Sequence, residues 1–201
     1  MSKYSKLTVG VLALQGDYQA HITQIEKLGA KARQVKLPAD LVSLDAIIIP
    51  GGESTTMNIL LDRFKLREPM TKFCGSKPTF GTCAGMIMLS KTIEDNLSGV
   101  KPLGLLDIDV LRNGYGRQIF SFEDNIPVDS KNGLTSLTGT FIRAPKITRK
   151  GSGVATLASY RESPVLVSEG NILASSFHTE LGSNTSLLQY FLDNFVPDKS
   201  I

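Results

Sequence analysis

The segment FGTCAGM, residues 80–86, decides the fold of this chain. The short apolar run at 78–80 that leads into it is typical of a buried strand. The apolar residues 86–89 that follow, running toward Lys91, are typical of a helix. Between the two lies Gly-x-Cys-x-Gly, the cysteine form of the nucleophile elbow, which is a sharp turn from a strand into a helix. The segment therefore predicts a strand-turn-helix unit with Cys83 at its tip.

The residue types around Cys83 suit a catalytic nucleophile. The turn packs its backbone tightly, so the flanking Gly81 and Gly85 must lack a side chain. Cys83 would project into the open at a helix N-terminus, where the helix dipole and free N–H groups favour a negatively charged thiolate. A buried cysteine in a glycine-rich turn remains the alternative, because so short a motif also occurs without catalysis.

The N-terminal part of the chain alternates between strand and helix patterns. Three runs rich in β-forming residues predict strands at 7–14, 32–37 and 45–49. Between the first two, Asp17 can cap a helix whose apolar positions recur as far as residue 28, and Gly29 closes it. This alternation predicts an α/β fold with a mostly parallel central sheet.

The rest of the chain adds helices and short strands without a linker. A helix that carries Met57 and Leu61 is predicted after the third strand, and Ser54 or Thr55 is expected to cap it. Further helices are predicted at 66–74 and 186–195, and further strands at 105–111, 119–122, 137–142, 154–158, 165–168 and 172–176. The strands at 119–122 and 137–142 alternate like an antiparallel section. We therefore predict one domain over residues 1–201.

Composition excludes several classes of function. The chain has 201 residues, 41% of them apolar and 20% charged, which is ordinary for a globular protein. Its net charge of +3 is too small for a nucleic-acid footprint, and Lys146, Arg149 and Lys150 are interpreted as a solvated loop. No apolar run approaches the ~20 residues of a membrane span, and residues 1–6 do not resemble a signal peptide.

The cysteine count points to a reducing compartment. Cys74 and Cys83 do not make a disulfide framework, so we expect a cytoplasmic protein. Cys74 shares the apolar face of the predicted helix at 66–74 and is interpreted as a core residue. Nothing in the sequence suggests a metal or an organic cofactor.

A glycine pair follows the third predicted strand. The segment PGGESTTM, residues 50–57, places Gly51 and Gly52 at the carboxyl end of the sheet, where ligands gather in open α/β folds. The predicted elbow puts Cys83 at the same edge. Bare backbone N–H groups in such a loop can hold a developing oxyanion. A plain turn with a helix cap is the alternative interpretation.

The last predicted strand leads into a histidine and a carboxylate. The chain has two histidines, His21 and His178. His21 lies in a predicted amphipathic helix and is interpreted as structural. His178 stands two residues before Glu180, and in an extended segment such side chains point the same way. Cys83, His178 and Glu180 would then act as nucleophile, base and orienting carboxylate.

A shaped loop supplies a candidate anion clamp. Residues 112–118 contain two glycines, an aromatic residue and two arginines. Arg112 can hold a carboxylate in two-point geometry, although a lone arginine is more often a surface residue.

Together these motifs resemble a known family. Gly-x-Cys-x-Gly at Cys83 with a late His-x-Glu resembles the class I, or triad, glutamine amidotransferases. Within them, the chain looks like the glutaminase subunits of pyridoxal 5′-phosphate synthase, through residues 10–16, 50–57, 112–113, 116–118, 141–145 and 176–178. One position departs from the pattern: the usual His-Pro-Glu is His178-Thr179-Glu180 here, which loosens the restraint that proline puts on the turn.

The resemblance implies a fold, a reaction and a partner. It implies a three-layer, flavodoxin-like α/β fold and hydrolysis of L-glutamine to glutamate and ammonia. Cys83 would attack the side-chain amide, His178 would move the proton and Glu180 would orient His178. The Gly51-Gly52 loop would supply the oxyanion hole. The glutamine pocket would be lined by Gly51, Gly52, Glu53, Arg112, Ile142 and Arg143, with the arginines as candidates for the α-carboxylate.

In such systems the ammonia passes to a separate synthase subunit, which builds the vitamin B6 cofactor from a pentose phosphate and a triose phosphate. The resemblance implies that the glutaminase docks on a large ring of synthase subunits and is poorly active alone. The segment around Gln15 is a candidate for the docking surface and for ordering the oxyanion loop.

Three other functions are compatible with parts of the pattern. The first is a non-catalytic partner that uses this scaffold only to regulate or stabilise a synthase, but the intact Cys83, His178 and Glu180 argue against it. Another elbow-cysteine protein, such as a peptidase or stress protein, is disfavoured by the loops at 50–54 and 112–118. An amidotransferase serving a different acceptor is the closest rival.

Overall fold

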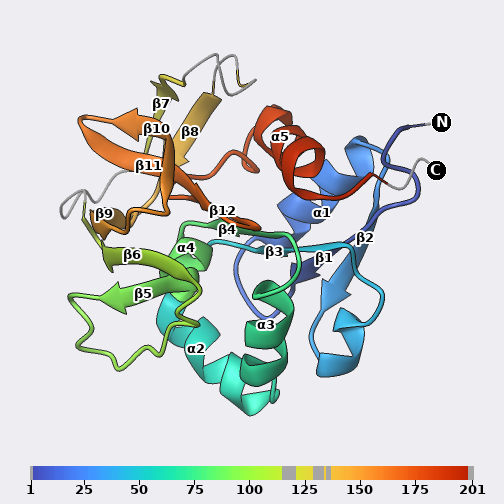
Figure 1. Cartoon of the computed structure of the whole chain (residues 1–201), viewed down its shortest axis with the longest axis horizontal. Helices are drawn as coiled ribbons and strands as arrows, with labels where there is room; N and C mark the ends of the chain where they lie inside the picture. Colours follow the sequence, from blue (N-terminus) through green and yellow to red (C-terminus); the bar gives the residue numbers. More distant parts are fainter. Residues whose placement is uncertain (1, 115–120, 129–133, 135–136, 199–201) are drawn as a thin grey trace.

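The computed structural model describes residues 2–114, 121–128, 134 and 137–198 (Figure 1). Within them a seven-stranded sheet runs in the order β10-β11-β12-β4-β3-β1-β2. Its strands are β1 (Thr8–Leu12), β2 (Lys31–Val35), β3 (Ala46–Ile49), β4 (Thr79–Thr82), β10 (Ala155–Tyr160), β11 (Ser163–Glu169) and β12 (Ile172–Ser175). The strands from β2 to β12 are parallel, and β11 and β10 add an antiparallel edge.

Helices cover both faces of this sheet. Helices α1 (Tyr18–Lys27) and α5 (Ser186–Phe195) lie on one face, and α2 (Ser54–Arg63), α3 (Arg67–Cys74) and α4 (Ala84–Leu89) lie on the other (Figure 1). Strand β3 shows why, because its residues alternate between the faces. Ile48 belongs to the core under α1 and α5, whereas Ile47 and Ile49 belong to the core under α2 to α4. The predicted three-layer α/β fold with a mostly parallel sheet is confirmed.

Two small sheets flank the main one. One has the order β5-β6-β9, formed by β5 (Ser90–Ile93), β6 (Leu106–Leu111) and β9 (Lys146–Lys150). The other pairs β7 (Phe122–Ile126) with β8 (Leu137–Phe141) in antiparallel register. A single 3₁₀ turn, η1 (Pro38–Leu41), follows β2 among the described residues. The smaller antiparallel section predicted from the sequence is therefore present.

Three sequence expectations in this region were wrong or displaced. The helix expected to run toward Lys91 ends at Leu89, because the chain pairs with β6 from Ser90 onward. Residues 146–150 are a strand, not a solvated loop, and Arg149 pairs there with Asp107 and Asp109. The strand expected at 119–122 begins only at Phe122, and residues 119 and 120 lie outside the described part.

The helix starts show one correct prediction and one error. Asp17 caps α1 as expected, since its Oδ1 accepts a hydrogen bond from the Ala20 backbone N–H at 3.2 Å. Helix α2 is capped by Glu53 and not by Ser54 or Thr55. The Glu53 side chain is one bond longer than the Asp side chain that usually caps helices. Its carboxylate still reaches the free N–H groups of the first turn.

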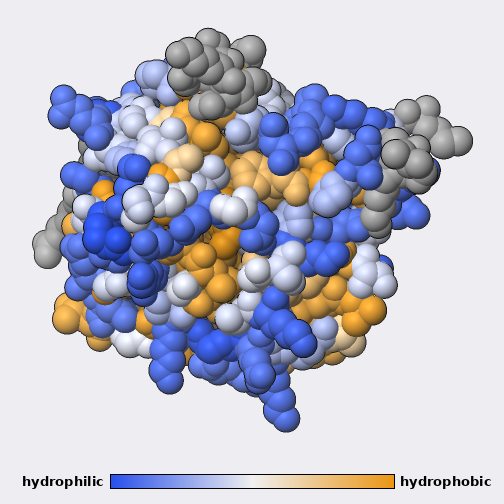
Figure 2. All heavy atoms as spheres, viewed as in Figure 1, coloured by the Kyte–Doolittle hydropathy of each residue, from blue (hydrophilic) through white to orange (hydrophobic). Residues whose placement is uncertain are grey.

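Surface and core agree with the composition. Figure 2 shows hydrophilic residues over much of one face, with apolar patches near its middle and toward its lower right. Cys74 is fully buried, as its place on an apolar helix face predicts, and burial raises the pKa of its thiol to about 12. Among the helices that the structure describes, none has the length and apolar character needed to cross a membrane.

Candidate active site

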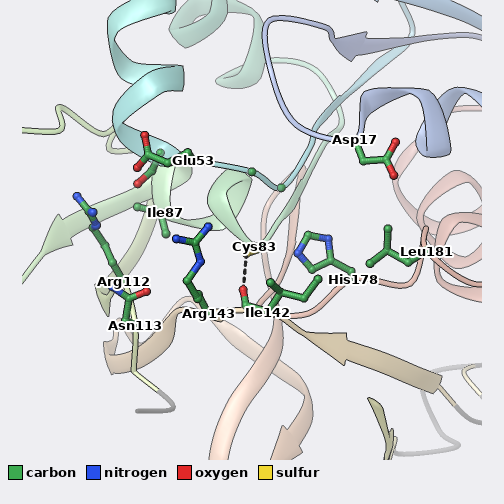
Figure 3. Close-up of a pocket in the computed structure, with 13 residues that line it drawn as sticks. Asp17, Glu53, Cys83, Ile87, Arg112, Asn113, Ile142, Arg143, His178 and Leu181 are labelled. Carbon is green, nitrogen blue, oxygen red and sulfur yellow. Dashed lines mark hydrogen bonds between the residues drawn. The ribbon is translucent and has the colours of Figure 1, made fainter. Parts of the chain in front are cut away.

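A cavity opens where the parallel strands end. Gly51 follows β3, Cys83 follows β4, and His178 comes three residues after the end of β12, so all three meet at one edge of the sheet (Figure 3). This is the edge at which open α/β sheets bind ligands. The cavity has a volume of about 240 Å³. That is below the ~300–1,000 Å³ of pockets for drug-sized ligands and suits a molecule the size of an amino acid.

Cys83 sits on the turn that its flanking glycines predict. Its φ of 49° and ψ of −104° lie in a region that side-chain-bearing residues rarely adopt. A Cβ on Gly85 would stand 2.1 Å from the Ile49 carbonyl oxygen, and one on Gly81 would stand 2.8 Å from the Gly85 carbonyl carbon. The strain at Cys83 is therefore held by tight packing on both sides, as expected where backbone strain serves a site.

The Cys83 side chain is nearly buried and faces the cavity. Its thiol donates to the Ile142 carbonyl oxygen at 3.8 Å, the contact drawn dashed in Figure 3. The residue is only 5% exposed. A ligand reaches the sulfur only by entering the cavity.

The imidazole of His178 is fixed by its backbone and by a carboxylate. The His178 N–H and carbonyl exchange hydrogen bonds of 2.9 Å with Thr140, at the edge of β8. Its Nδ1 lies 2.5 Å from Glu180 Oε1. A Cβ on Gly51 would approach His178 Cε1 to 2.2 Å, so the glycine allows the loop after β3 to lie against the ring.

Two opposing effects set the charges of this pair. Burial disfavours both charged forms, lowering the pKa of His178 and raising that of Glu180. Hydrogen bonds outweigh this effect of burial. His178 interacts with Cys83 and Glu180, and Glu180 interacts with His178 and His21. These hydrogen bonds raise the pKa of His178 to about 10 and hold the pKa of Glu180 well below its usual range. At neutral pH the site holds an imidazolium beside a carboxylate.

All the residues expected to line a glutamine pocket surround the cavity. They are Gly51, Gly52, Glu53, Arg112, Ile142 and Arg143. Arg143 has a φ of 45°. The guanidinium of Arg112 donates to the hydroxyls of Ser98 and Thr55, which fixes its direction. Their role in binding glutamine stays a prediction, and residues 116–118 of the same motif set lie outside the described part.

Glu53 uses its carboxylate differently from the other residues of this set. Its two oxygens accept from the Thr55 and Thr56 backbone N–H groups at 3.0 and 2.6 Å. Burial acts to raise the pKa of Glu53, but these bonds hold it below its usual value. The carboxylate thus shapes the loop that carries Gly51 and Gly52.

Sequence reasoning missed several residues at this site. Asp17, Ile87, Asn113 and Leu181 also line the cavity. His21, interpreted as structural, has its Nε2 3.4 Å from Glu180 Oε1. Partial evidence for a role of His21 at the site was present in the sequence, since it is one of two histidines in the chain. It also lies four residues after the Asp17 cap, behind the same sheet edge.

Gln15 stands behind the glycine pair. Its Oε1 accepts the Glu53 backbone N–H at 2.8 Å. Its Nε2 is buried and finds no hydrogen-bond partner among the described residues. Leaving such a donor unpaired costs about 1–3 kcal/mol. The loop after β3 is therefore held from behind by a side chain with one hydrogen-bonding group unsatisfied.

No cluster of three or more metal-binding side chains occurs in the described ranges. The arrangement offers a thiol, an imidazole and a carboxylate in series, a loop with exposed backbone next to the thiol, and two guanidinium groups across the cavity. Such a set can carry out acyl transfer on an amide that belongs to a small anionic molecule.

Comparison with known proteins gives a consistent result. The model of the SNO glutamine amidotransferase family matches residues 11–197. The chain is 47% identical to the pyridoxal 5′-phosphate synthase subunit PdxT of Francisella tularensis subsp. novicida, over 92% of this chain and 97% of that protein. The same identity and coverage hold for PdxT of Francisella tularensis subsp. holarctica.

Solved structures agree. A crystal structure of a glutamine amidotransferase superposes with a TM-score of 0.85 at 45% identity, covering 92% of this chain and 97% of that one. PurLQS from Thermotoga maritima gives a TM-score of 0.68 at 18% identity, covering 94% and 98%, a likeness of fold alone.

Proposed function

Because the chain belongs to the SNO glutamine amidotransferase family, we propose that it is the glutaminase subunit of a pyridoxal 5′-phosphate synthase. It hydrolyses L-glutamine to L-glutamate and ammonia and delivers the ammonia to a synthase subunit for vitamin B6 biosynthesis. One observation carries the reaction: Cys83 and His178 line the same cavity, and Glu180 lies behind the imidazole.

The first half of the reaction forms a thioester. The Cys83 thiolate attacks the side-chain amide carbon of glutamine, and the carbonyl oxygen becomes an oxyanion. Backbone N–H groups of the Gly51-Gly52 loop stabilise that oxyanion. His178, as an imidazolium, gives its proton to the amide nitrogen, so the carbon–nitrogen bond breaks and ammonia leaves. Glu180 keeps the imidazole oriented and charged.

The second half releases glutamate. The neutral His178 takes a proton from water, and the resulting hydroxide attacks the thioester carbon. The carbon–sulfur bond breaks, and the Cys83 thiolate is restored beside the imidazolium. Glutamine and water are thereby converted into glutamate and ammonia, with no redox step and no further reactant.

The cavity wall selects the substrate by charge. Arg112 and Arg143 line the side of the cavity across from His178 (Figure 3). Either guanidinium can bind the α-carboxylate of glutamine in two-point geometry. A simple amide without that carboxylate would lose this contact, so we expect such amides to be poor substrates.

The synthase partner acts on the loop after β3. We propose that a ring-shaped synthase oligomer in the cytoplasm binds this chain near Gln15. The buried Gln15 Nε2, which lacks an acceptor in the described structure, supports this site, because docking or a loop movement can supply one. The glutaminase would then be poorly active alone and stimulated by its partner.

The test is ammonia release from glutamine by the chain mixed with its synthase subunit, compared with Cys83→Ala. Cys83→Ala should retain the fold, seen as unchanged circular dichroism, and lose at least about 10³-fold in rate, the scale found when a triad nucleophile is removed. Full activity in that variant would end the proposal. If the wild-type mixture released no ammonia, the chain would be a non-catalytic partner instead.

A further inference from the structure

A second imidazole meets the carboxylate behind His178. His21 lies on α1, is 2% exposed, and places Nε2 3.4 Å from Glu180 Oε1 and 3.3 Å from Thr82 Oγ1. We propose that His21 is a positioning residue of the active site, which donates its Nε2–H to Glu180 and so holds that carboxylate against His178. This inference rests on the glutaminase function proposed above.

The geometry around Glu180 shows what holds it. Its side chain is 1% exposed, so water does not hydrate the charge. Oε1 meets two imidazoles, His178 Nδ1 at 2.5 Å and His21 Nε2 at 3.4 Å. Oε2 accepts the Thr179 backbone N–H at 3.0 Å. A buried carboxylate needs such donors in place of water, because an unpaired charge in the interior is very costly.

The neighbours of His21 select its tautomer. An ionised Glu180 only accepts hydrogen bonds, so an unprotonated Nε2 would point a lone pair at a negative oxygen. The Nε2–H form instead donates toward Glu180 Oε1, with the Thr82 hydroxyl as a second partner at similar distance. His21 therefore supplies a proton donor to the carboxylate whether the ring is neutral or charged.

His21 is well placed to fix the carboxylate because its own position is fixed. Helix α1 begins at the Asp17 cap and packs on the sheet through Ile22 and Ile25. Thr82 is the last residue of β4 and immediately precedes Cys83. The His21 ring thus bridges the strand that carries the nucleophile and the carboxylate that orients the base.

The first test compares substitutions of His21 in the complete complex with the synthase subunit. His21→Phe keeps a ring of similar size but removes the donor, and His21→Gln restores an N–H. For His21→Phe we expect kcat for ammonia release to fall about tenfold to a hundredfold with little change in KM, the range for losing a hydrogen bond to a charged group. His21→Gln should recover most of that loss.

A matched control separates positioning from stability. Leu192→Ala removes buried apolar atoms from α5, which covers the same face of the sheet, and leaves the helix that carries His21 intact. It should lower the melting temperature and leave kcat within about twofold, because a cavity in the core does not reorient the imidazole. If His21→Phe lost activity only in proportion to its melting temperature, or if His21→Gln fell as far as His21→Phe, the proposal would be wrong. A rise in KM alone would contradict it too.

A second readout does not depend on glutamine turnover. Cys83 is the cysteine in the cavity, whereas Cys74 is fully buried, so alkylation of the native protein by iodoacetamide reports on Cys83. A misplaced Glu180 no longer holds the imidazole in place beside Cys83, so the sulfur loses the neighbour that assists its attack on the reagent. His21→Phe should slow alkylation severalfold at neutral pH, and Leu192→Ala should not. Equal rates in all variants would overturn the role of His21, whereas a wild-type chain that alkylates normally but releases no ammonia would overturn only the proposed function.

Discussion

The two sides of the proposed catalytic cavity differ in how completely their hydrogen bonds are satisfied. On the side of His178, each oxygen of the buried Glu180 has a hydrogen-bond donor, and the His178 backbone is tied to β8. On the side of the Gly51-Gly52 loop, the buried Gln15 has an amide nitrogen without an acceptor among the described residues. The His178 side is preorganised for the proposed proton transfer, whereas the hydrogen bonding behind the Gly51-Gly52 loop is left incomplete. This difference is what a glutaminase needs if ammonia is to form only when an acceptor is docked.

The largest effect should come from removing the charge on the preorganised side. In Glu180→Gln the amide keeps the shape but cannot stabilise an imidazolium, so we expect kcat to fall on the order of 10³-fold, similar in scale to charge loss in other triads. Steady-state ammonia release in the complex measures this. A loss under tenfold would mean that the His178 side is not preorganised by its carboxylate.

The pH dependence of stability should expose the same ion pair. The pKa of Glu180 is held below its usual range, so its contribution is present above the unfolded pKa near 4.5 and is lost as pH falls. The pKa of His178 is raised to about 10, so its contribution is complete below about 6.5 and is lost as pH rises toward 10. The pair therefore stabilises the fold most between about pH 4.5 and 6.5.

Melting temperatures of the wild-type chain and of His178→Gln, recorded from pH 4 to 10, check this. Their difference should be largest near pH 5–6 and shrink toward pH 10. A difference that grows above pH 7 would have the wrong sign and would show that His178 is neutral in the folded protein.

On the side of the Gly51-Gly52 loop we expect a smaller loss of activity, and one that depends on the synthase subunit. Gln15→Leu removes the acceptor of the Glu53 N–H and the unpaired amide together. We expect stimulation by the synthase subunit to fall about tenfold, since one hydrogen bond that shapes the loop is lost. The melting temperature should change little, because loss of the bond is offset by loss of the unsatisfied donor. Equal loss of activity with and without the partner would show that Gln15 serves the fold and not the docking response.

The same contrast explains what the sequence could reveal. The strained turn at Cys83 was predictable because Gly81 and Gly85 report it directly. The contact between His178 and Glu180 was predictable because two positions separate them, but the extended segment expected there was wrong, since the chain bends at Thr179. These features are local in sequence. The alternating strand and helix patterns likewise predicted the layers, since burial on both faces leaves continuous apolar runs.

Features that depend on contacts between distant segments were not predictable. His21 and Glu180 are far apart in the chain, and a buried histidine on a helix gives no sign of which carboxylate it will meet. Strand β9 looked like a basic loop because the partners of Arg149, Asp107 and Asp109, lie on β6, far away in the sequence. Glu53 was expected as a pocket residue, and its capping of α2 becomes visible only when the loop geometry is known.

The smallest effect should come from Thr179, which stands where related chains would be expected to carry proline. Loss of the proline restraint looked unfavourable from the sequence. In the structure, however, threonine provides a backbone N–H group, which proline lacks. Its backbone N–H donates to Glu180 Oε2 at 3.0 Å. A proline there has no N–H to donate but stiffens the turn, which contributes about 0.4–1 kcal/mol. The two effects oppose each other.

Thr179→Pro should therefore lower kcat only about two- to fivefold, because His178 and His21 still hold the other oxygen of Glu180. Thr179→Ala keeps the N–H and is the matched control, expected to retain nearly full activity. If Thr179→Pro were faster than the wild type, rigidity of the turn would matter more than the third donor. We also expect the double variant Thr179→Pro, His21→Phe to lose more in kcat than the product of the two single losses. In that variant Glu180 retains only His178 of its three donors.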